Sequence, residues 1–284
     1  MMKNIEETIF YLKCKDHTVT GEDFKLYFDK KREMLITLPK PEVEELGRYY
    51  KSQDYISHTD SKRSFFEKVY HIVKTYSINK KVKLISKLLN KPGQLLDIGA
   101  GTGDFLSTAR KHNWKIKGVE PNESARFLAK RKGINLDINT DTYGMQKMDV
   151  ITMWHVLEHV PDVEYQVSEI KRLLKPNGYV IVAVPNFRSY DAAYYKSFWA
   201  AYDVPRHLWH FSKVSLKYFF EKEGMFLEKV KPMKFDSFYV SLLSEKYKTG
   251  KMNFLKALTI GFLSNLKGYV SKEYSSHIYI FKNR

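Results

Sequence analysis

Apolar positions along the chain change their spacing near residue 92. Upstream, they recur every three or four residues over 62–90, which predicts a long helix that ends before Pro92-Gly93. Downstream, short apolar runs alternate with segments of helical spacing. They predict strands over 94–98, 116–119, 150–153 and 179–184, and helices over 104–112, 124–131 and 163–174. This alternation indicates an α/β fold with a doubly wound, mostly parallel sheet.

The N-terminal region follows another pattern. Residues 1–45 carry β-branched and aromatic runs on either side of a Thr20–Asp23 turn. They predict a small β-rich appendage ahead of a main domain over 46–284.

The region after the alternating core adds two inserts. An aromatic-rich segment, 186–211, follows the strand over 179–184, and Ser212 then caps a helix. Further strands are predicted over 226–231 and 276–281, with helical spacing between them. Ligands bind beyond the carboxyl ends of parallel strands, so we expect 186–211 and the helical stretch 235–275 to be substrate-side inserts.

A glycine-rich loop joins the first strand of the core to the next helix. It reads Leu95-Leu-Asp-Ile-Gly-Ala-Gly-Thr-Gly103, and its glycines permit a tight turn against which a ligand can lie. Asp97 is badly placed for a pyrophosphate but suits a ligand with ammonium and sulfonium groups. Glu120 ends the following strand, where a carboxylate can accept hydrogen bonds from ribose hydroxyls.

Residues 155–159 read His-Val-Leu-Glu-His, which is a signature of one class of zinc peptidases. There, two histidines one helical turn apart hold zinc and the glutamate serves as base. Here His155 directly follows a predicted strand, and Pro161 lies two residues after His159, so the helix is very short. We therefore expect no metal. We expect Glu158 to hold the loop by hydrogen bonds to nearby backbone.

Four motifs occur in an order that resembles class I S-adenosylmethionine-dependent methyltransferases, of the branch that includes ubiquinone and menaquinone biosynthesis enzymes. The resemblance covers about residues 60–231 and implies a seven-stranded, Rossmann-like sheet with S-adenosylmethionine as cofactor. The motifs are Leu96-Asp-Ile-Gly-Ala-Gly-Thr-Gly103, Gly118-Val-Glu-Pro121, the segment Met148–Val160, and Leu174-Lys-Pro-Asn-Gly178.

The resemblance also implies roles for individual residues. Asp137 and Asp141 both lie near the expected adenine site, and the sequence does not choose between them. The candidate catalytic residues are His155, His159 and His207. The residues implied in cofactor binding are Asp97, Gly99, Ala100, Gly101, Gly103, Glu120, Pro121, Asn139, Thr140, Trp154 and His155.

A second polar cluster lies in the insert, over Asp203–Ser212. His207 is a candidate general base, and Arg206 a candidate ligand for an anionic substrate group. Alternatively, both residues anchor the insert. Tyr55 and His58 precede the first long helix, where relatives fold a segment over the cofactor, so they are candidate lid residues.

Some relatives carry a four-cysteine zinc ribbon near the N-terminus. Here Cys14 and His17 keep one pair of ligand types, but no second pair follows, so we expect a degenerate ribbon without metal. This segment is also a candidate surface for oligomers. Residues 254–270 are amphipathic and basic. They are consistent with a lid or a membrane-surface helix, although core packing is favoured.

Composition narrows the class of protein. The 284 residues include one cysteine, so an intrachain disulfide is excluded, and we expect a cytoplasmic protein without a signal peptide or membrane span. Lysine and arginine (48) exceed aspartate and glutamate (32), giving a net charge of +16. A basic balance favours an acidic partner such as RNA or a phosphate-bearing substrate, or simply a lysine-rich surface.

These features predict a methyltransferase that acts on a small-molecule or lipid-like acceptor. The strand end lacks the Asn/Asp-Pro-Pro-aromatic motif of many enzymes that methylate planar amines. By analogy with the family, this favours oxygen, carbon or aliphatic nitrogen as acceptor atom, and among these we expect O- or C-methylation. Three alternatives remain: an RNA methyltransferase, which predicts salt-dependent RNA binding; a non-catalytic scaffold, which predicts no cofactor binding; and a zinc hydrolase, which predicts zinc lost on His155→Ala.

Overall fold

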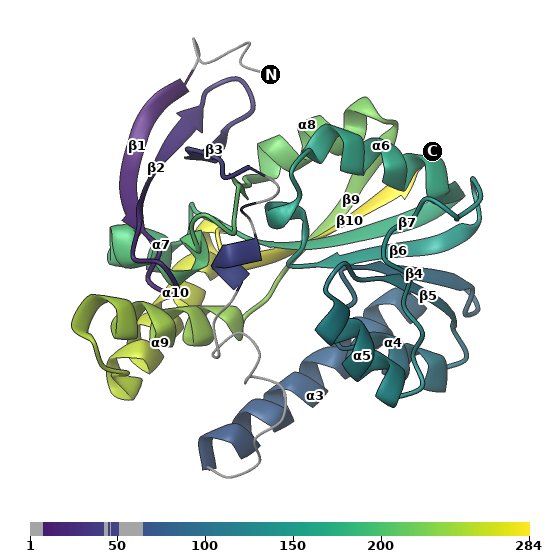
Figure 1. Ribbon diagram of the computed structural model, residues 1–284, viewed down its shortest axis with the longest axis horizontal. Coiled ribbons are helices and arrows are strands. Elements are labelled where there is room, and N and C mark those ends of the chain that lie inside the picture. Colours follow the sequence, from purple (N-terminus) through teal and green to yellow (C-terminus); the bar gives the residue numbers. More distant parts are fainter. Residues whose placement is uncertain (1–7, 43–44, 46, 51–64) are drawn as a thin grey trace.

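The protein folds into two β-sheets surrounded by helices. The computed structural model describes residues 8–42, 45, 47–50 and 65–284. The larger sheet crosses the centre of the molecule, and the smaller one stands at its N-terminal side (Figure 1).

The larger sheet has the strand order β5-β4-β6-β7-β10-β9. The first four strands run parallel, and β10 lies antiparallel to both of its neighbours. The predicted doubly wound, mostly parallel sheet is therefore confirmed. Its strands are β4 (Gln94–Ile98), β5 (Lys115–Val119), β6 (Met148–Trp154), β7 (Leu174–Pro185), β9 (Met225–Pro232) and β10 (Ser276–Asn283).

We expected seven strands in this sheet, and the described residues form six of them. Beyond β5 the chain comes alongside the sheet again at Asp137, which forms an isolated parallel bridge with Val119. Two backbone hydrogen bonds hold it, from Glu120 to Asp137 and from Asp137 to Gly118. The segment 134–139 thus occupies the edge of the sheet without forming a strand.

Helices cover both faces of the larger sheet (Figure 1). Consecutive strand residues point to opposite faces, so Leu95 packs with α3 and α4, whereas Leu96 lies in the core that includes α6 and α8. The helices on one face are α3 (Phe65–Ser86), α4 (Asp104–Lys111) and α5 (Glu123–Arg131), and those on the other are α6 (Val163–Leu173) and α8 (Lys213–Lys222).

The smaller sheet combines the N-terminal appendage with the insert. Its order is β1-β2-β3-β8, in which Leu35 pairs with His210 and Ile36 with Trp209. The third strand was not predicted. The strands are β1 (Thr8–Lys15), β2 (Asp23–Asp29), β3 (Met34–Leu38) and β8 (Trp209–His210), and a short 3-10 helix, η1 (Gly47–Tyr50), follows β3 along the chain.

The inserts supply the remaining helices. Between β7 and β8 lie α7 (Tyr190–Tyr195), η3 (Lys196–Phe198) and η4 (Ala200–Tyr202), and between β9 and β10 lie α9 (Asp236–Thr249) and α10 (Phe254–Ser271). Core packing accounts for only one face of α10, where Ala257 and Ile260 are buried; Leu255, Leu258 and Phe262 are exposed. Among the described helices, none has the length and apolar character needed to cross a bilayer.

Candidate active site

The glycine loop runs from the end of β4 to the start of α4. Gly99, Gly101 and Gly103 all have positive φ, between 53° and 74°, which favours glycine. A β-carbon at Gly99 would lie 2.4 Å from Cγ2 of Val156, so this position has no room for a side chain. At Gly101 a β-carbon would meet nothing within 4 Å, so the loop presents open backbone there. This open backbone fits the approach of a cofactor.

Glu120 ties the end of β5 to this loop. Its Oε2 accepts a hydrogen bond from the Gly101 backbone N–H at 2.8 Å, and its Oε1 accepts one from Asn122 N–H at 2.9 Å. A carboxylate offers about four lone-pair positions, so two remain for hydroxyl groups of a ligand. Glu120 therefore suits ribose binding and shapes the loop as well.

Asp97 lies at the carboxyl edge of β4 and is 2 % exposed. Its Oδ1 accepts a hydrogen bond from the Thr152 hydroxyl at 2.6 Å. Burial raises the pKa of Asp97 to about 7, although the Thr152 hydrogen bond and the nearby charge of Lys81 act to lower it. A ligand ammonium at this carboxylate would stabilise its ionised form.

His155 lies directly after β6 and has a φ of 58°. Its Nε2 is 3.2 Å from Oδ2 of Asp236 in α9, and its Nδ1 is 3.4 Å from Oε1 of Glu158. Burial lowers the pKa of His155, but the two carboxylates outweigh burial and raise it to about 9. His155 is therefore a cation at neutral pH in this arrangement, which does not suit a general base.

His159 ends the 3-10 helix η2 (Leu157–His159), and His207 lies before β8; their ring centroids are 4.5 Å apart. His159 Nδ1 is 3.1 Å from the Arg206 carbonyl oxygen, and His207 Nδ1 is 2.9 Å from that of Ala201. Burial, followed by the neighbouring His207, lowers the pKa of His159 to about 4. The structure thus brings together two of the three candidate catalytic histidines.

Glu158 is 1 % exposed and precedes His159. Its two side-chain oxygens have no hydrogen-bond partner within the described part of the chain. The expectation that Glu158 holds the loop by hydrogen bonds to backbone is therefore wrong. Its place is held instead by the main chain, because its carbonyl oxygen accepts a hydrogen bond from Leu208 N–H at 2.8 Å.

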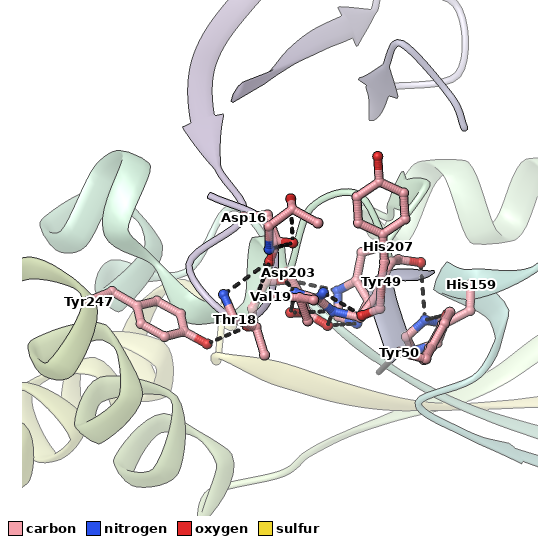
Figure 2. A network of polar contacts seen from close by, with 12 residues as sticks. Asp16, Thr18, Val19, Tyr49, Tyr50, His159, Asp203, His207 and Tyr247 are labelled. Carbon is pink, nitrogen blue, oxygen red and sulfur yellow. Dashed lines mark hydrogen bonds and ion pairs between the residues drawn. The ribbon is translucent and has the colours of Figure 1, made fainter. Parts of the chain in front are cut away.

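Arg206 is buried, and the geometry supports its anchoring role. Its Nη2 donates to Asp203 Oδ1 at 2.7 Å and to Asp16 Oδ1 at 2.9 Å, and its Nη1 donates to the Tyr49 carbonyl oxygen at 2.9 Å. Figure 2 shows this network, in which Asp16, Tyr49 and Asp203 converge from distant segments. Arg206 thus fastens the insert to the N-terminal region.

The residues expected beside the adenine lie after α5. The Thr140 hydroxyl donates a hydrogen bond to the Glu169 carboxylate of α6 at 2.6 Å. The Asn139 side-chain oxygen accepts one from the Asp141 N–H at 3.2 Å. Asp137 accepts a hydrogen bond from the Tyr143 hydroxyl. These contacts do not decide between Asp137 and Asp141, and the adenine contact stays a prediction.

The remaining loop residues have local roles. Ala100 N–H donates to the Val119 carbonyl oxygen at 3.0 Å, and the Pro121 carbonyl oxygen accepts a hydrogen bond from Arg126 at 2.7 Å. The Trp154 ring packs edge-on against Phe105 at 5.5 Å. The Nζ atom of Lys81 lies over the face of the Trp154 ring, 4.3 Å from the ring centroid.

Other candidates lie away from these contacts. The expected lid residues Tyr55 and His58 fall outside the described residues. Cys14 is 2 % exposed in an apolar cluster, and burial raises the pKa of its thiol to about 12. The His17 ring stacks on that of Tyr247 at 4.8 Å.

Sequence reasoning missed several residues of the site. Lys81 sits in the helical pattern of α3, and Asp236 starts a helix about 80 residues beyond His155. Thr152 lies inside a buried strand, where a threonine is an ordinary residue. Only alternation along β6 gives a signal, because Thr152 and Asp97 occupy adjacent, paired positions on parallel strands.

The model of one protein family, described as a methyltransferase domain, matches residues 70–229, which is more than half of the chain. The chain belongs to the methyltransferase domain family. The match runs from α3 to β9 and includes the glycine loop, Glu120, η2 and the His207 segment. The N-terminal sheet strands β1 to β3 and the helices α9 and α10 lie outside it.

This methyltransferase domain is similar to known proteins over part of its length. It is 30 % identical over 122 residues to a ubiquinone biosynthesis O-methyltransferase of Coxiella burnetii, a match that covers 39 % of this chain and 52 % of that protein. The chain therefore spans about half the length of the curated relatives it matches.

Solved structures confirm the fold. A Haemonchus contortus phosphoethanolamine-type N-methyltransferase, in complex with S-adenosylhomocysteine, matches with a TM-score of 0.54 at 14 % identity, covering 97 % of this chain and 68 % of its own. Geranyl diphosphate C-methyltransferase of Streptomyces coelicolor matches with a TM-score of 0.53 at 14 % identity, covering 80 % and 88 %. The architecture is thus that of S-adenosylmethionine-dependent methyltransferases.

Proposed function

We propose that the protein is an S-adenosylmethionine-dependent methyltransferase that acts on a small-molecule or lipid-like acceptor, at oxygen or carbon. The observation that carries the proposal is the Glu120–Gly101 hydrogen bond beside buried Asp97, because it places two carboxylates on either side of open loop backbone. The relatives named as ubiquinone O-methyltransferases support an oxygen acceptor.

The cofactor, when bound, supplies an activated methyl group on a sulfonium. Asp97 would hold its ammonium, and Glu120 would hold its ribose hydroxyls. The chain then needs to orient an acceptor and, where required, remove a proton. His207 Nδ1 faces the Ala201 carbonyl oxygen, which only accepts hydrogen bonds, so this nitrogen carries hydrogen and Nε2 of His207 is a proton acceptor. His159 Nδ1 lies 3.1 Å from the Arg206 carbonyl oxygen and 3.2 Å from the Tyr50 hydroxyl, which can donate or accept.

The test is calorimetric titration of S-adenosylmethionine and S-adenosylhomocysteine into the purified protein and its Glu120→Ala variant. Two hydrogen bonds to a charged group are lost, so we expect binding to weaken about hundredfold or more. Glu123→Ala is the matched control, because Glu123 is an exposed acid in the first turn of α5. Absence of binding to the folded wild-type protein would favour a scaffold, while salt-dependent RNA binding would favour the RNA alternative.

A further inference from the structure

The outward face of α10 is apolar and open to solvent. The helices α9 and α10 pack against each other at one edge of the molecule (Figure 1). Seven large apolar side chains of α10 are between 48 % and 80 % exposed: Phe254, Leu255, Leu258, Phe262, Leu266, Tyr269 and Val270. Proteins in water rarely expose a contiguous apolar face of this size without a partner that covers it.

The opposite face of α10 is fixed to the rest of the protein. The Ser264 hydroxyl donates a hydrogen bond to Oδ1 of Asp191 in α7 at 2.6 Å. The Gly261 carbonyl oxygen accepts one from the Ser237 hydroxyl of α9 at 3.0 Å. A β-carbon at Gly261 would lie 2.6 Å from Cδ1 of Phe238, so α9 and α10 are in close contact there. The helix is thus held firmly on one side, which presents its other side as a rigid surface.

The exposed side chains of α10 are arranged symmetrically about Phe262. Those on either side of it lie four, seven and eight residues away in both directions along the chain. The matching pairs are Leu258 and Leu266, Leu255 and Tyr269, and Phe254 and Val270. A second α10 that runs antiparallel, related by a two-fold axis at Phe262, would place each side chain opposite its match. A two-fold interface requires a self-complementary surface of this kind.

The charges of α10 lie away from this face. Its charged residues, Lys256 and Lys267, are eleven positions apart and therefore share one flank of the helix. Lys256 turns toward α9, where its Nζ is 3.7 Å from Oε1 of Glu245. Two copies can therefore meet along the apolar face without opposing like charges. A helix that lies on a lipid surface usually has a strongly charged face, so the charge pattern favours a second copy of the chain.

We propose that the protein forms a two-fold symmetric dimer in which α10 packs antiparallel against α10 of a second copy. Phe262 lies at the axis, and a central aromatic side chain among apolar neighbours is typical of the residues that dominate binding. Burying the seven side chains of each copy removes on the order of 1,000 Å² from water, which reaches the lower range of specific interfaces. The dimer does not depend on the proposed function.

The dimer would also bear on the candidate active site. Helix α9 begins at Asp236, whose carboxylate contacts His155 after β6. The Asn265 side chain of α10 donates a hydrogen bond to the carbonyl oxygen of Lys234, two residues before α9 starts. A partner that holds α10 therefore also steadies the start of α9 beside His155.

The experiment measures the mass of the full-length protein by sedimentation equilibrium over a range of concentrations. We expect the wild type to reach twice the 33.5 kDa of one chain. Phe262→Lys should raise the dimer dissociation constant at least about hundredfold, because it removes the central aromatic pair and sets two like charges face to face. Phe127→Lys is the matched control, since Phe127 on α5 is 63 % exposed and Phe262 is 62 % exposed; this variant should dimerise as the wild type does.

Disulfide cross-linking tests the antiparallel arrangement. Leu255 would lie opposite Tyr269 of the second copy, but about 21 Å along the helix from its own counterpart. Under mild oxidation, the double variant Leu255→Cys/Tyr269→Cys should therefore form covalent dimers, whereas Leu255→Cys alone should not. The native Cys14 is 2 % exposed and should not take part.

Three results would overturn the proposal. The first is a wild-type protein that stays monomeric across the micromolar range. The second is Phe262→Lys that dimerises as tightly as the wild type, which would move the contact elsewhere, for example to residues 1–45. The third is a monomeric wild type that binds vesicles of anionic phospholipid when Phe262→Lys does not, which would make lipid the partner of α10. Calorimetric titration of S-adenosylhomocysteine tests the proposed function separately.

Discussion

The cofactor edge and the hydrogen-bond network around Arg206, called here the Arg206 network, are built in opposite ways. The cofactor edge comes from two nearby stretches, Asp97–Gly103 and Glu120, connected by backbone hydrogen bonds. The Arg206 network joins Asp16, Asp203 and Arg206 through side-chain hydrogen bonds, and its Arg206–Asp16 bond spans 190 residues. The first depends on backbone conformation, whereas the second depends on charge pairing out of water.

The largest effect is expected from Arg206→Met, which removes the centre of the Arg206 network. Removing Arg206 leaves the buried carboxylate of Asp16 and the partly buried carboxylate of Asp203 without their cation, which costs about 3–5 kcal/mol of unfolding free energy. Urea unfolding measures the change. The control is Arg188→Met, because Arg188 also pairs with the N-terminal region, at Glu33, but on the surface, where we expect about 0–1 kcal/mol. Equal losses in both variants would contradict the comparison.

Gly99→Ala should break the cofactor edge by steric means. Its positive φ costs about 1 kcal/mol and the contact with Val156 about 1–3 kcal/mol more. Gly101→Ala meets no atoms, so it should cost only about 1 kcal/mol of stability while still weakening cofactor binding. Thermal unfolding and calorimetry on both variants test the order, and a more destabilised Gly101→Ala would refute it.

Cofactor affinity should depend on pH through Asp97. Its pKa is raised to about 7, so the carboxylate that binds an ammonium is fully ionised only above that value. Affinity for S-adenosylhomocysteine should therefore fall about tenfold per unit below pH 7, and fall again at alkaline pH, where the ligand's own ammonium loses its proton. Asp97→Asn should bind weakly at every pH, and a wild-type profile flat between pH 5 and 8 would contradict the assignment.

Thr140→Val should have the smallest effect. It tests whether the cofactor edge extends as far as Thr140. The Thr140 hydroxyl bonds to Glu169, so its loss should cost about 1 kcal/mol of stability. Cofactor affinity should change by less than about twofold, because the side chain is already engaged away from the loop. A larger loss of affinity would restore Thr140 as an adenine contact.

The same contrast explains what the sequence could predict. Strands β4 to β7 and the glycine loop follow from local spacing, and family resemblance gave Asp97 and Glu120 their roles. The edge segment at Asp137 pairs with β5 through a single bridge and two hydrogen bonds, so it is not a strand. The spacing of apolar residues does not show how far such pairing extends. The partners of His155 and Arg206 come from Asp236 and Asp16, and such distant pairings depend on how whole elements pack.

The two-residue strand β8 couples the backbone of the smaller sheet to the segment of the insert that carries His207. Thr37 N–H donates to the Leu208 carbonyl oxygen at 3.0 Å, and the Thr37 hydroxyl donates to that of His207. Amide hydrogen exchange at Thr37 therefore requires the His207 segment to detach from β3. The exchange rate of this single amide in the N-terminal sheet thus reports how often the loop that carries His207 opens.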